Sequence, residues 1–179
     1  IQAIFQDPYS SLNPRMTVKR ILGEPLRVHR IVSQEAMADK TVALLQLVGM
    51  DPNLSSCYPY ELSTGQRKRV AIARALVGEP SLVLADEPTG NIDSHQGAEI
   101  MALIRNLAKS GEQTVLLVTH SDQAAHTADY VWTIQDGRLV TRTERHPELV
   151  ARLHDKIHPR GSERWNALIK DVSSCTVRR

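Results

Sequence analysis

The amino-acid sequence predicts an α/β fold: a mostly parallel β-sheet packed against helices, with an all-helical subdomain inserted into it. Two short apolar runs, 82–85 and 115–118, have the length and the turn-forming borders of strands buried on both faces. Between these runs, four apolar residues recur at the spacing of an amphipathic helix: Ile100, Leu103, Ile104 and Leu107. Alternation of strand, helix and strand favours parallel pairing with helices on the faces of the sheet.

The catalytic core strands are expected in two pieces, about residues 1–6 and 80–141. Residues 1–5 are typical of the end of an apolar strand, and a run of turn formers follows them. Because the chain opens within this strand pattern, without a methionine, we expect it to be an N-terminally truncated fragment. Later in the chain, strand patterns at 130–135 and 138–141 are joined by Asp-Gly, which is a hairpin signal.

The helical subdomain is expected over about residues 14–79, where helical patterns alone occur. Three helices are predicted there: one that begins after Thr17 and breaks near Pro25, one from Ser33 to a stop at Gly49, and one over 66–77. Residues 1–141 would then form one partial domain. Residues 142–179 carry only weak helix patterns and are expected to be a helical or frayed C-terminal extension.

Composition excludes several classes of protein. Hydrophobic residues make up 41% of the chain and charged residues 23%, which is typical of a globular protein. No apolar run approaches the roughly 18 residues that a membrane-spanning helix needs. The net charge is +2 and aromatic residues make up 4%, so neither charge nor base stacking indicates nucleic-acid binding.

An acidic pair, Asp86 and Glu87, directly follows the first buried strand. Open α/β sheets bind ligands at the carboxyl ends of their strands. An aspartate at this position can hold Mg²⁺ in nucleotide hydrolases, and the neighbouring glutamate could orient or deprotonate an attacking water. The alternative is that the two carboxylates only solvate a turn.

A second candidate site precedes the predicted helix over 66–77. Ser63, the backbone amides that follow it and the positive end of the helix dipole together form an anion site, and Gly65 allows close approach of a phosphate. The alternative is an ordinary N-capped helix. Three basic residues in the first turns, Arg67, Lys68 and Arg69, oppose the dipole, which favours an external anion as the reason for their presence.

Two polar residues follow the other strands of the predicted sheet. His120 comes directly after the second buried run and could contact a γ-phosphate or carry a proton. Gln6 follows the first strand, and its amide oxygen could join a Mg²⁺ shell. Taken alone, each is more simply explained as a structural or solvent-exposed residue.

The order of these residues is that of the ATP-binding cassette ATPases, and the sequence resembles this family over about residues 1–141. Five ordered segments carry the resemblance: Gln6 (Q-loop), 62–66 (signature), Asp86-Glu87 (Walker B), 90–93 (D-loop) and His120 (switch histidine). The resemblance implies a P-loop NTPase core that uses ATP and Mg²⁺. It also implies two such domains that meet head to tail and enclose two ATP molecules.

The resemblance assigns a role to each matching residue. Glu87 would be the general base, and His120 would contact the γ-phosphate. Asp86 and Gln6 would hold Mg²⁺. The nucleotide-binding residues would be Gln6, Ser63, Thr64, Gly65, Gln66 and Asp93. The partners would be transmembrane permease subunits and a second ATPase subunit, identical or not, at the cytoplasmic face of the inner (plasma) membrane.

The sequence departs from the family pattern at two points. Thr64 stands where the signature has its first glycine, which adds a side chain where backbone meets phosphate. The 179 residues also contain no G-x-x-x-x-G-K-[ST] segment, the Walker A or P-loop motif that supplies much of the affinity for the triphosphate. The chain by itself is therefore expected to bind ATP poorly and to hydrolyse it negligibly, while its full-length parent does both.

The sequence leaves open which kind of transporter the chain belongs to, and functions other than transport are also considered. The segment 5–18 resembles the dipeptide, oligopeptide and nickel importers, whereas 85–93 resembles lipoprotein and macrolide exporters, and the importer type is favoured. Chromosome-maintenance ATPases carry a long coiled coil between Q-loop and signature, but here Leu62 follows Gln6 by only 56 positions without sustained heptads. A non-catalytic remnant is the third alternative, because the P-loop is absent.

Overall fold

The computed structural model describes residues 1–7, 11–109, 113–136 and 138–144. The chain divides into two compact units, Ile1–Ala124 and Ala125–Arg179. The predicted C-terminal extension lies outside the described residues from position 145 onward. The first unit has the predicted α/β architecture and contains every candidate site residue.

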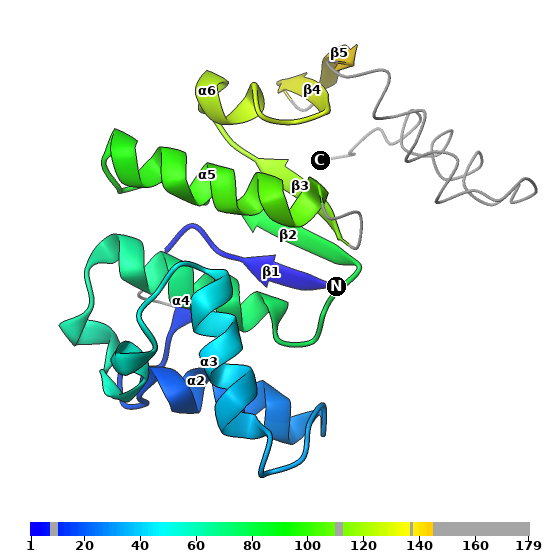
Figure 1. Cartoon of the computed structure of the whole chain (residues 1–179). Helices are drawn as coiled ribbons and strands as arrows, with labels where there is room; N and C mark the ends of the chain where they lie inside the picture. Colours follow the sequence, from blue (N-terminus) through cyan, green and yellow to red (C-terminus); the bar gives the residue numbers. More distant parts are fainter. Residues whose placement is uncertain (8–10, 110–112, 137, 145–179) are drawn as a thin grey trace, which may run out of the picture. The chain divides into compact units, whose positions relative to one another are not determined.

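Three parallel strands form the sheet of the first unit, in the order β1-β2-β3: β1 (Gln2–Ile4), β2 (Leu82–Asp86) and β3 (Thr114–Val118). Figure 1 shows them side by side with the same direction. Ile4 is paired with Ala85, and Asp86 with Val118. The carboxyl ends of all three strands therefore meet at one edge of the sheet.

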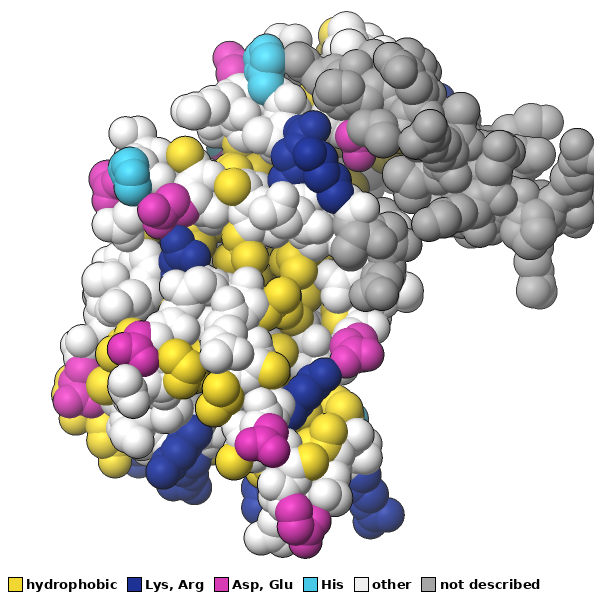
Figure 2. Space-filling model, in the orientation of Figure 1, with side chains coloured by type: hydrophobic (Ala, Val, Ile, Leu, Met, Phe, Trp, Pro, Cys, Tyr) yellow, Lys and Arg dark blue, Asp and Glu magenta, His cyan; other side chains and the backbone are white. Residues whose placement is uncertain are grey.

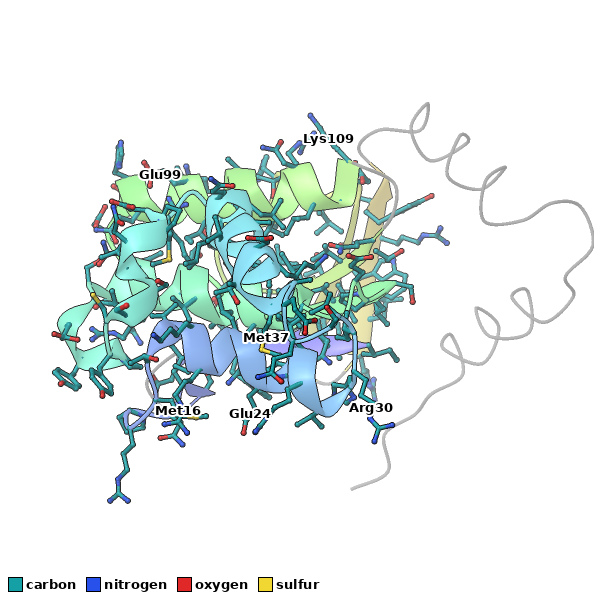
Figure 3. All side chains as sticks on the ribbon, turned by 60° about the horizontal axis from the view of Figure 1, so that its bottom comes forward. Met16, Glu24, Arg30, Met37, Glu99 and Lys109 are labelled. Atoms are coloured by element: carbon teal, nitrogen blue, oxygen red, sulfur yellow. The ribbon has the colours of Figure 1, made fainter. Side chains whose placement is uncertain are left out.

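Two helices pack against this sheet. Helix α4 (Thr64–Leu76) lies against β1, and α5 (Ser94–Lys109) lies against β3 and also contacts α4 (Figure 1). The central strand is the best covered, since Val83 and Ala85 are each only 1% exposed. On β3, by contrast, Leu116 and Val118 are about half exposed, so the prediction that this strand is buried on both faces was wrong. Figure 3 shows α5 side-on, with Glu99 in its first half and Lys109 at its carboxyl end.

The helical subdomain lies between β1 and β2 in the chain. It contains α2 (Val18–Val28), α3 (Met37–Leu47), two short 3₁₀ helices (Pro52–Ser56 and Pro59–Glu61) and α4. Its core includes Leu22, Leu26 and Leu45, which are fully buried. A Cβ on Gly23 would lie 3.4 Å from the sulfur of Met37 (labelled in Figure 3), so α2 and α3 approach each other closely.

Three details of the predicted helices were wrong. Helix α2 is not broken at Pro25 but continues to Val28, because burial of Leu26 keeps the last turn against the core. Ser33 does not cap α3, which begins at Met37 with Ala36 before it. Helix α4 begins at Thr64, two residues earlier than the apolar pattern indicated, because the side chain of Ser63 caps it.

The second unit contains the predicted hairpin. Strand β4 (Tyr130–Gln135) pairs antiparallel with β5 (Arg138–Glu144), which is three residues longer than expected, and the register shifts between Thr133 and Ile134. The guanidinium of Arg142 lies 5.6 Å from the ring centre of Tyr130.

The surface carries mixed charge. On the face drawn in Figure 2, acidic and basic side chains of the described residues are interspersed rather than gathered into fields of one sign. Within the described ranges, no helix is both long enough and apolar enough to span a bilayer.

Candidate functional site

The carboxyl ends of the three parallel strands bring together residues that are far apart in the chain. Gln6 follows β1, Glu87 follows β2, and Thr119 and His120 follow β3. This is the edge at which open α/β sheets bind ligands. The strand order places Glu87 in the middle of the set.

The carboxylate of Glu87 is held by the end of β3. Its Oε1 accepts a hydrogen bond of 2.6 Å from the backbone amide of His120, and its Oε2 accepts one of 3.3 Å from the hydroxyl of Thr119. The side chain of Glu87 is only 16% exposed. A carboxylate offers about four acceptor positions, so two donors fix its orientation and leave capacity for a water molecule.

The backbone of Glu87 is strained, and that strain directs the carboxylate. Its φ is +42°, in the left-handed region of backbone conformation that residues other than glycine rarely adopt. Two hydrogen bonds support this conformation: the amide of Glu87 donates to Val118 O at 2.9 Å, and Gly90 donates to Glu87 O at 3.0 Å. The chain thus turns sharply after β2, as active-site backbones often do.

His120 and Gln6 lie on either side of this turn. The imidazole of His120 is 99% exposed, and its Nε2 is 3.9 Å from Oε1 of Glu87. A Cβ added at Gly90 would lie 3.7 Å from both Cγ and Nε2 of Gln6, so the Gln6 side chain lies along the turn that follows Glu87. The structure therefore brings Gln6, Glu87 and His120 into one neighbourhood.

Asp86 ends β2 with an exposed side chain. No cluster of three or more His, Cys, Asp or Glu side chains occurs among the described residues. Protein Mg²⁺ sites commonly use one or two carboxylates and complete the shell with phosphate and water oxygens. An exposed carboxylate at the strand edge, with the amide oxygen of Gln6 as a second hard donor, therefore fits Mg²⁺.

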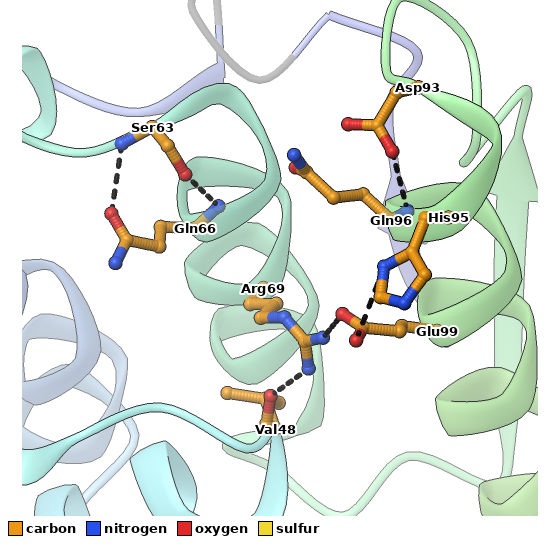
Figure 4. Close-up of polar contacts among 8 residues, drawn as sticks. All are labelled: Val48, Ser63, Gln66, Arg69, Asp93, His95, Gln96 and Glu99. Carbon is orange, nitrogen blue, oxygen red and sulfur yellow. Dashed lines mark hydrogen bonds and ion pairs between the residues drawn. The ribbon is translucent and has the colours of Figure 1, made fainter.

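The signature segment forms the N-terminus of α4 through reciprocal capping (Figure 4). The amide of Gln66 donates to Oγ of Ser63 at 3.2 Å, and the amide of Ser63 donates to Oε1 of Gln66 at 2.9 Å. Thr64 opens the helix, and its hydroxyl accepts a hydrogen bond of 3.3 Å from Arg67. Ser63 and Gln66 thus already stabilise the helix start, before any ligand is considered.

The start of α5 lies next to the signature glycine. Asp93 accepts a hydrogen bond of 2.9 Å from the amide of Gln96, which caps α5, and the side chain of Gln96 extends over Gly65 (Figure 4). A Cβ on Gly65 would clash with Oε1 of Gln96. A side chain at position 65 would therefore have to displace the Gln96 side chain, so a contact within the chain favours glycine here in addition to any approach of a phosphate.

The three basic residues after the signature have partners within the chain, so the expectation that they need an external anion was wrong. Arg67 donates to Pro59 O and Lys68 donates to Gln6 O, both at 3.1 Å. Arg69 donates at 2.6 Å to both Val48 O and the carboxylate of Glu99 (Figure 4). The dipole penalty is offset by these hydrogen bonds.

Three residues near the site were not singled out from the sequence: Thr119, Gln96 and Glu99. Thr119 could have been found, because it follows β3 next to His120 and has a hydroxyl donor. The contacts of Gln96 and Glu99 depend on how α4 packs against α5, which no sequence pattern indicates.

A cavity of about 360 Å³ lies elsewhere in the first unit. Residues of β1, the last turns of α2 and α4 and the segments after them line it. None of the candidate site residues is among the residues that line this cavity.

Comparison with known proteins finds relatives of this chain both by sequence and by fold. Residues 1–90 match the family model described as ABC transporter. The oligopeptide transport ATP-binding protein AppF of Bacillus subtilis is 37% identical over 147 residues, which are 82% of this chain and 45% of that protein. OppF of Salmonella typhimurium, also an oligopeptide transport ATP-binding protein, is 39% identical over 78% of this chain and 42% of its own length.

The same fold occurs in a solved ATP-binding cassette, MJ0796, described as a dimer in a post-hydrolysis state bound to ADP and Pi. The match has a TM-score of 0.71 and 30% identity, and covers 80% of this chain and 62% of that one. This chain spans less than half the length of the two oligopeptide relatives.

Proposed function

Because this chain belongs to the ABC transporter family, we propose that it is part of an ATP-hydrolysing subunit that powers transport across a membrane. The observation that carries the proposal is the position of Glu87. Its carboxylate stands between the ends of β1 and β3, and two donors on β3 orient it. The description of MJ0796, with ADP and Pi bound, supports hydrolysis of ATP as the reaction of this fold.

Glu87 acts as the general base. Its two protein donors leave acceptor positions for a water molecule, and the same donors keep the carboxylate from rotating away from it. His120 is exposed beside Glu87, where its imidazole can donate a hydrogen bond to the γ-phosphate. Positioning of the water against the phosphorus is the main catalytic contribution of such sites.

Asp86 and Gln6 would hold Mg²⁺ at the edge of the sheet. The ion would neutralise negative charge on the β- and γ-phosphates. Asp86 is exposed at the end of β2, where its carboxylate is accessible to an ion. The P-loop that cradles the phosphates belongs to the complete protein, of which this chain would supply the part from the Q-loop onward.

The signature binds the nucleotide of a second ATPase subunit. Ser63 already caps α4, so the helix N-terminus is preorganised and its free amides and dipole favour a phosphate. Asp93 caps α5 next to the signature, which places the D-loop at the same surface. The dimeric state described for MJ0796 supports a head-to-tail pair in which each chain completes the site of the other.

The transported substrate is a peptide, and the direction is import. AppF and OppF, both named for oligopeptide transport, match this chain over about four fifths of its length. The complete subunit binds permease subunits and through them lies at the cytoplasmic face of the plasma membrane. The residues discussed above are assigned to nucleotide and metal, so peptide specificity is assigned to the permease partners.

ATP-dependent dimerisation of the complete protein tests this proposal. Sedimentation of the Glu87→Gln variant with ATP and Mg²⁺ is expected to show dimers. The double variant Glu87→Gln with Ser63→Arg is expected to stay monomeric, because the arginine side chain is larger than serine and carries a positive charge that blocks the N-terminus of α4. Lys109→Ala, at the far end of α5, is the control and leaves dimerisation unchanged. Identical sedimentation with and without ATP would contradict the head-to-tail dimer that encloses ATP.

A further inference from the structure

Lys68 is a charged side chain inside the protein. It is only 4% exposed, although it belongs to the first turns of α4, close to the exposed signature. A buried ammonium group is costly unless it has partners. Its Nζ donates a hydrogen bond of 3.1 Å to the backbone carbonyl of Gln6, the residue that follows β1.

The surroundings of Lys68 connect it to both strand ends. Burial lowers the pKa of Lys68, and the negative charges of Asp7 and Glu87 act in the opposite direction. Asp7 continues the segment after β1, and Glu87 follows β2. The ammonium group is therefore hydrogen-bonded to the segment that holds Gln6 and interacts electrostatically with Glu87.

Helix α4 joins Lys68 to the signature. Lys68 follows Ser63 by five positions, about one and a half turns of one continuous helix. Such a short stretch of helix is rigid, so a displacement of the signature would also displace the backbone at Lys68. The hydrogen bond from Nζ could then pass that displacement to the main chain at Gln6.

We propose that Lys68 is a positioning residue that couples the signature end of α4 to Gln6 and Glu87 of the same chain. The inference rests on the proposed function, in which the signature binds one nucleotide of the dimer, whereas Gln6 and Glu87 belong to the site of the other nucleotide. Lys68 would then connect the two nucleotides of the dimer within each subunit. Its action is mechanical and electrostatic; it does not touch the substrate.

Steady-state ATP hydrolysis by the complete protein tests the coupling. Lys68→Met removes both the donor and the charge, and is expected to lower kcat about tenfold while the KM for ATP changes less than about twofold. Lys68→Gln keeps an N–H donor and is expected to retain more turnover than Lys68→Met. The matched control is Lys40→Met, which removes a lysine bonded to Glu79 at 2.6 Å on the surface and leaves kcat unchanged.

Hydrogen–deuterium exchange in the same variants separates this inference from the proposed function. Lys68→Met is expected to speed amide exchange at residues 4–7 and 87–90, whereas Lys40→Met does not, whether or not the protein hydrolyses ATP. Unchanged exchange at both segments would overturn the coupling. A kcat that stays at the wild-type value in Lys68→Met, in a protein that does hydrolyse ATP, would overturn it as well. Absence of hydrolysis in the wild type would instead contradict the proposed function.

Discussion

The backbone amide of His120 donates a 2.6 Å hydrogen bond to Oε1 of Glu87, and this bond joins the ends of β3 and β2. The carboxylate is thus oriented by the main chain of His120 and not by its imidazole, whose Nε2 lies 3.9 Å from the same oxygen. The position of Glu87 therefore does not depend on the identity of the side chain at position 120. Substitution of His120 is expected to change contacts with the nucleotide and to leave the orientation of Glu87 intact.

Thr119 provides the second donor to Glu87, so its removal loosens the carboxylate. Thr119→Val keeps the shape of the side chain but loses the 3.3 Å hydrogen bond to Oε2. We expect kcat of the complete protein to fall about fivefold, which corresponds to about 1 kcal/mol. Thr133→Val, at an exposed position of β4, is the matched control for ATPase measurements. A kcat equal to that of the wild type would show that Oε1 alone fixes the carboxylate.

Gly65 and Gln96 are expected to be energetically coupled. In the wild-type background, Gly65→Ala forces the Gln96 side chain to move, which offsets the gain in helix propensity from alanine. In a Gln96→Ala background the same change is expected to stabilise the protein by up to about 1 kcal/mol. Denaturant unfolding of the four proteins in this cycle measures the coupling, for which we expect at least about 0.5 kcal/mol. Additive effects would show that Gln96 does not restrict position 65.

Arg69 joins three elements, since it binds Val48 O after α3 and Glu99 of α5 from its place in α4. Arg69→Met is expected to lower the free energy of unfolding by about 2 kcal/mol, because the Val48 carbonyl loses a charged donor. Glu99→Gln removes only the charge of a half-exposed partner, and is expected to cost less than about 1 kcal/mol. Denaturant unfolding checks both values. Equal losses in the free energy of unfolding for the two variants would contradict the larger contribution assigned to the hydrogen bond from Arg69 to Val48 O.

The 179-residue chain by itself is expected to bind ATP weakly and to hydrolyse it negligibly. It contains no P-loop, whose lysine and backbone amides supply much of the affinity for a triphosphate. Calorimetric titration with Mg²⁺ and ATP and an assay of phosphate release measure the two properties. Turnover by this chain at millimolar ATP would contradict the expectation.

The strand ends could be predicted from the sequence because they follow from simple rules. Two apolar runs that each end in polar residues identify strands of a parallel sheet, and parallel strands present their carboxyl ends at one edge. That one face of β3 is half exposed could not be predicted from its apolar run. Glu87 and His120 are therefore expected there, as is Gln6 after the first strand. The order β1-β2-β3, which places Glu87 between the other two, required the structure.

The contacts of the basic residues could not be predicted. The sequence indicated that Arg67, Lys68 and Arg69 oppose the dipole of α4, but not which way each side chain points. Three consecutive residues on a helix point in three directions, so they meet the Pro59 carbonyl, the Gln6 carbonyl and Glu99 respectively. Which element covers each direction is a property of tertiary packing.

The most direct test of the central claim is ATP turnover by the complete protein with glutamine in place of Glu87. Glu87→Gln keeps the shape of the side chain and one of its two acceptor oxygens, but cannot take a proton from water. We expect hydrolysis to fall at least about 100-fold, equivalent to roughly 2.7 kcal/mol of barrier, while ATP binding is retained. Glu79→Gln, an identical change at an exposed surface position, should leave turnover unchanged. Wild-type turnover in Glu87→Gln would contradict the assignment of Glu87 as the base.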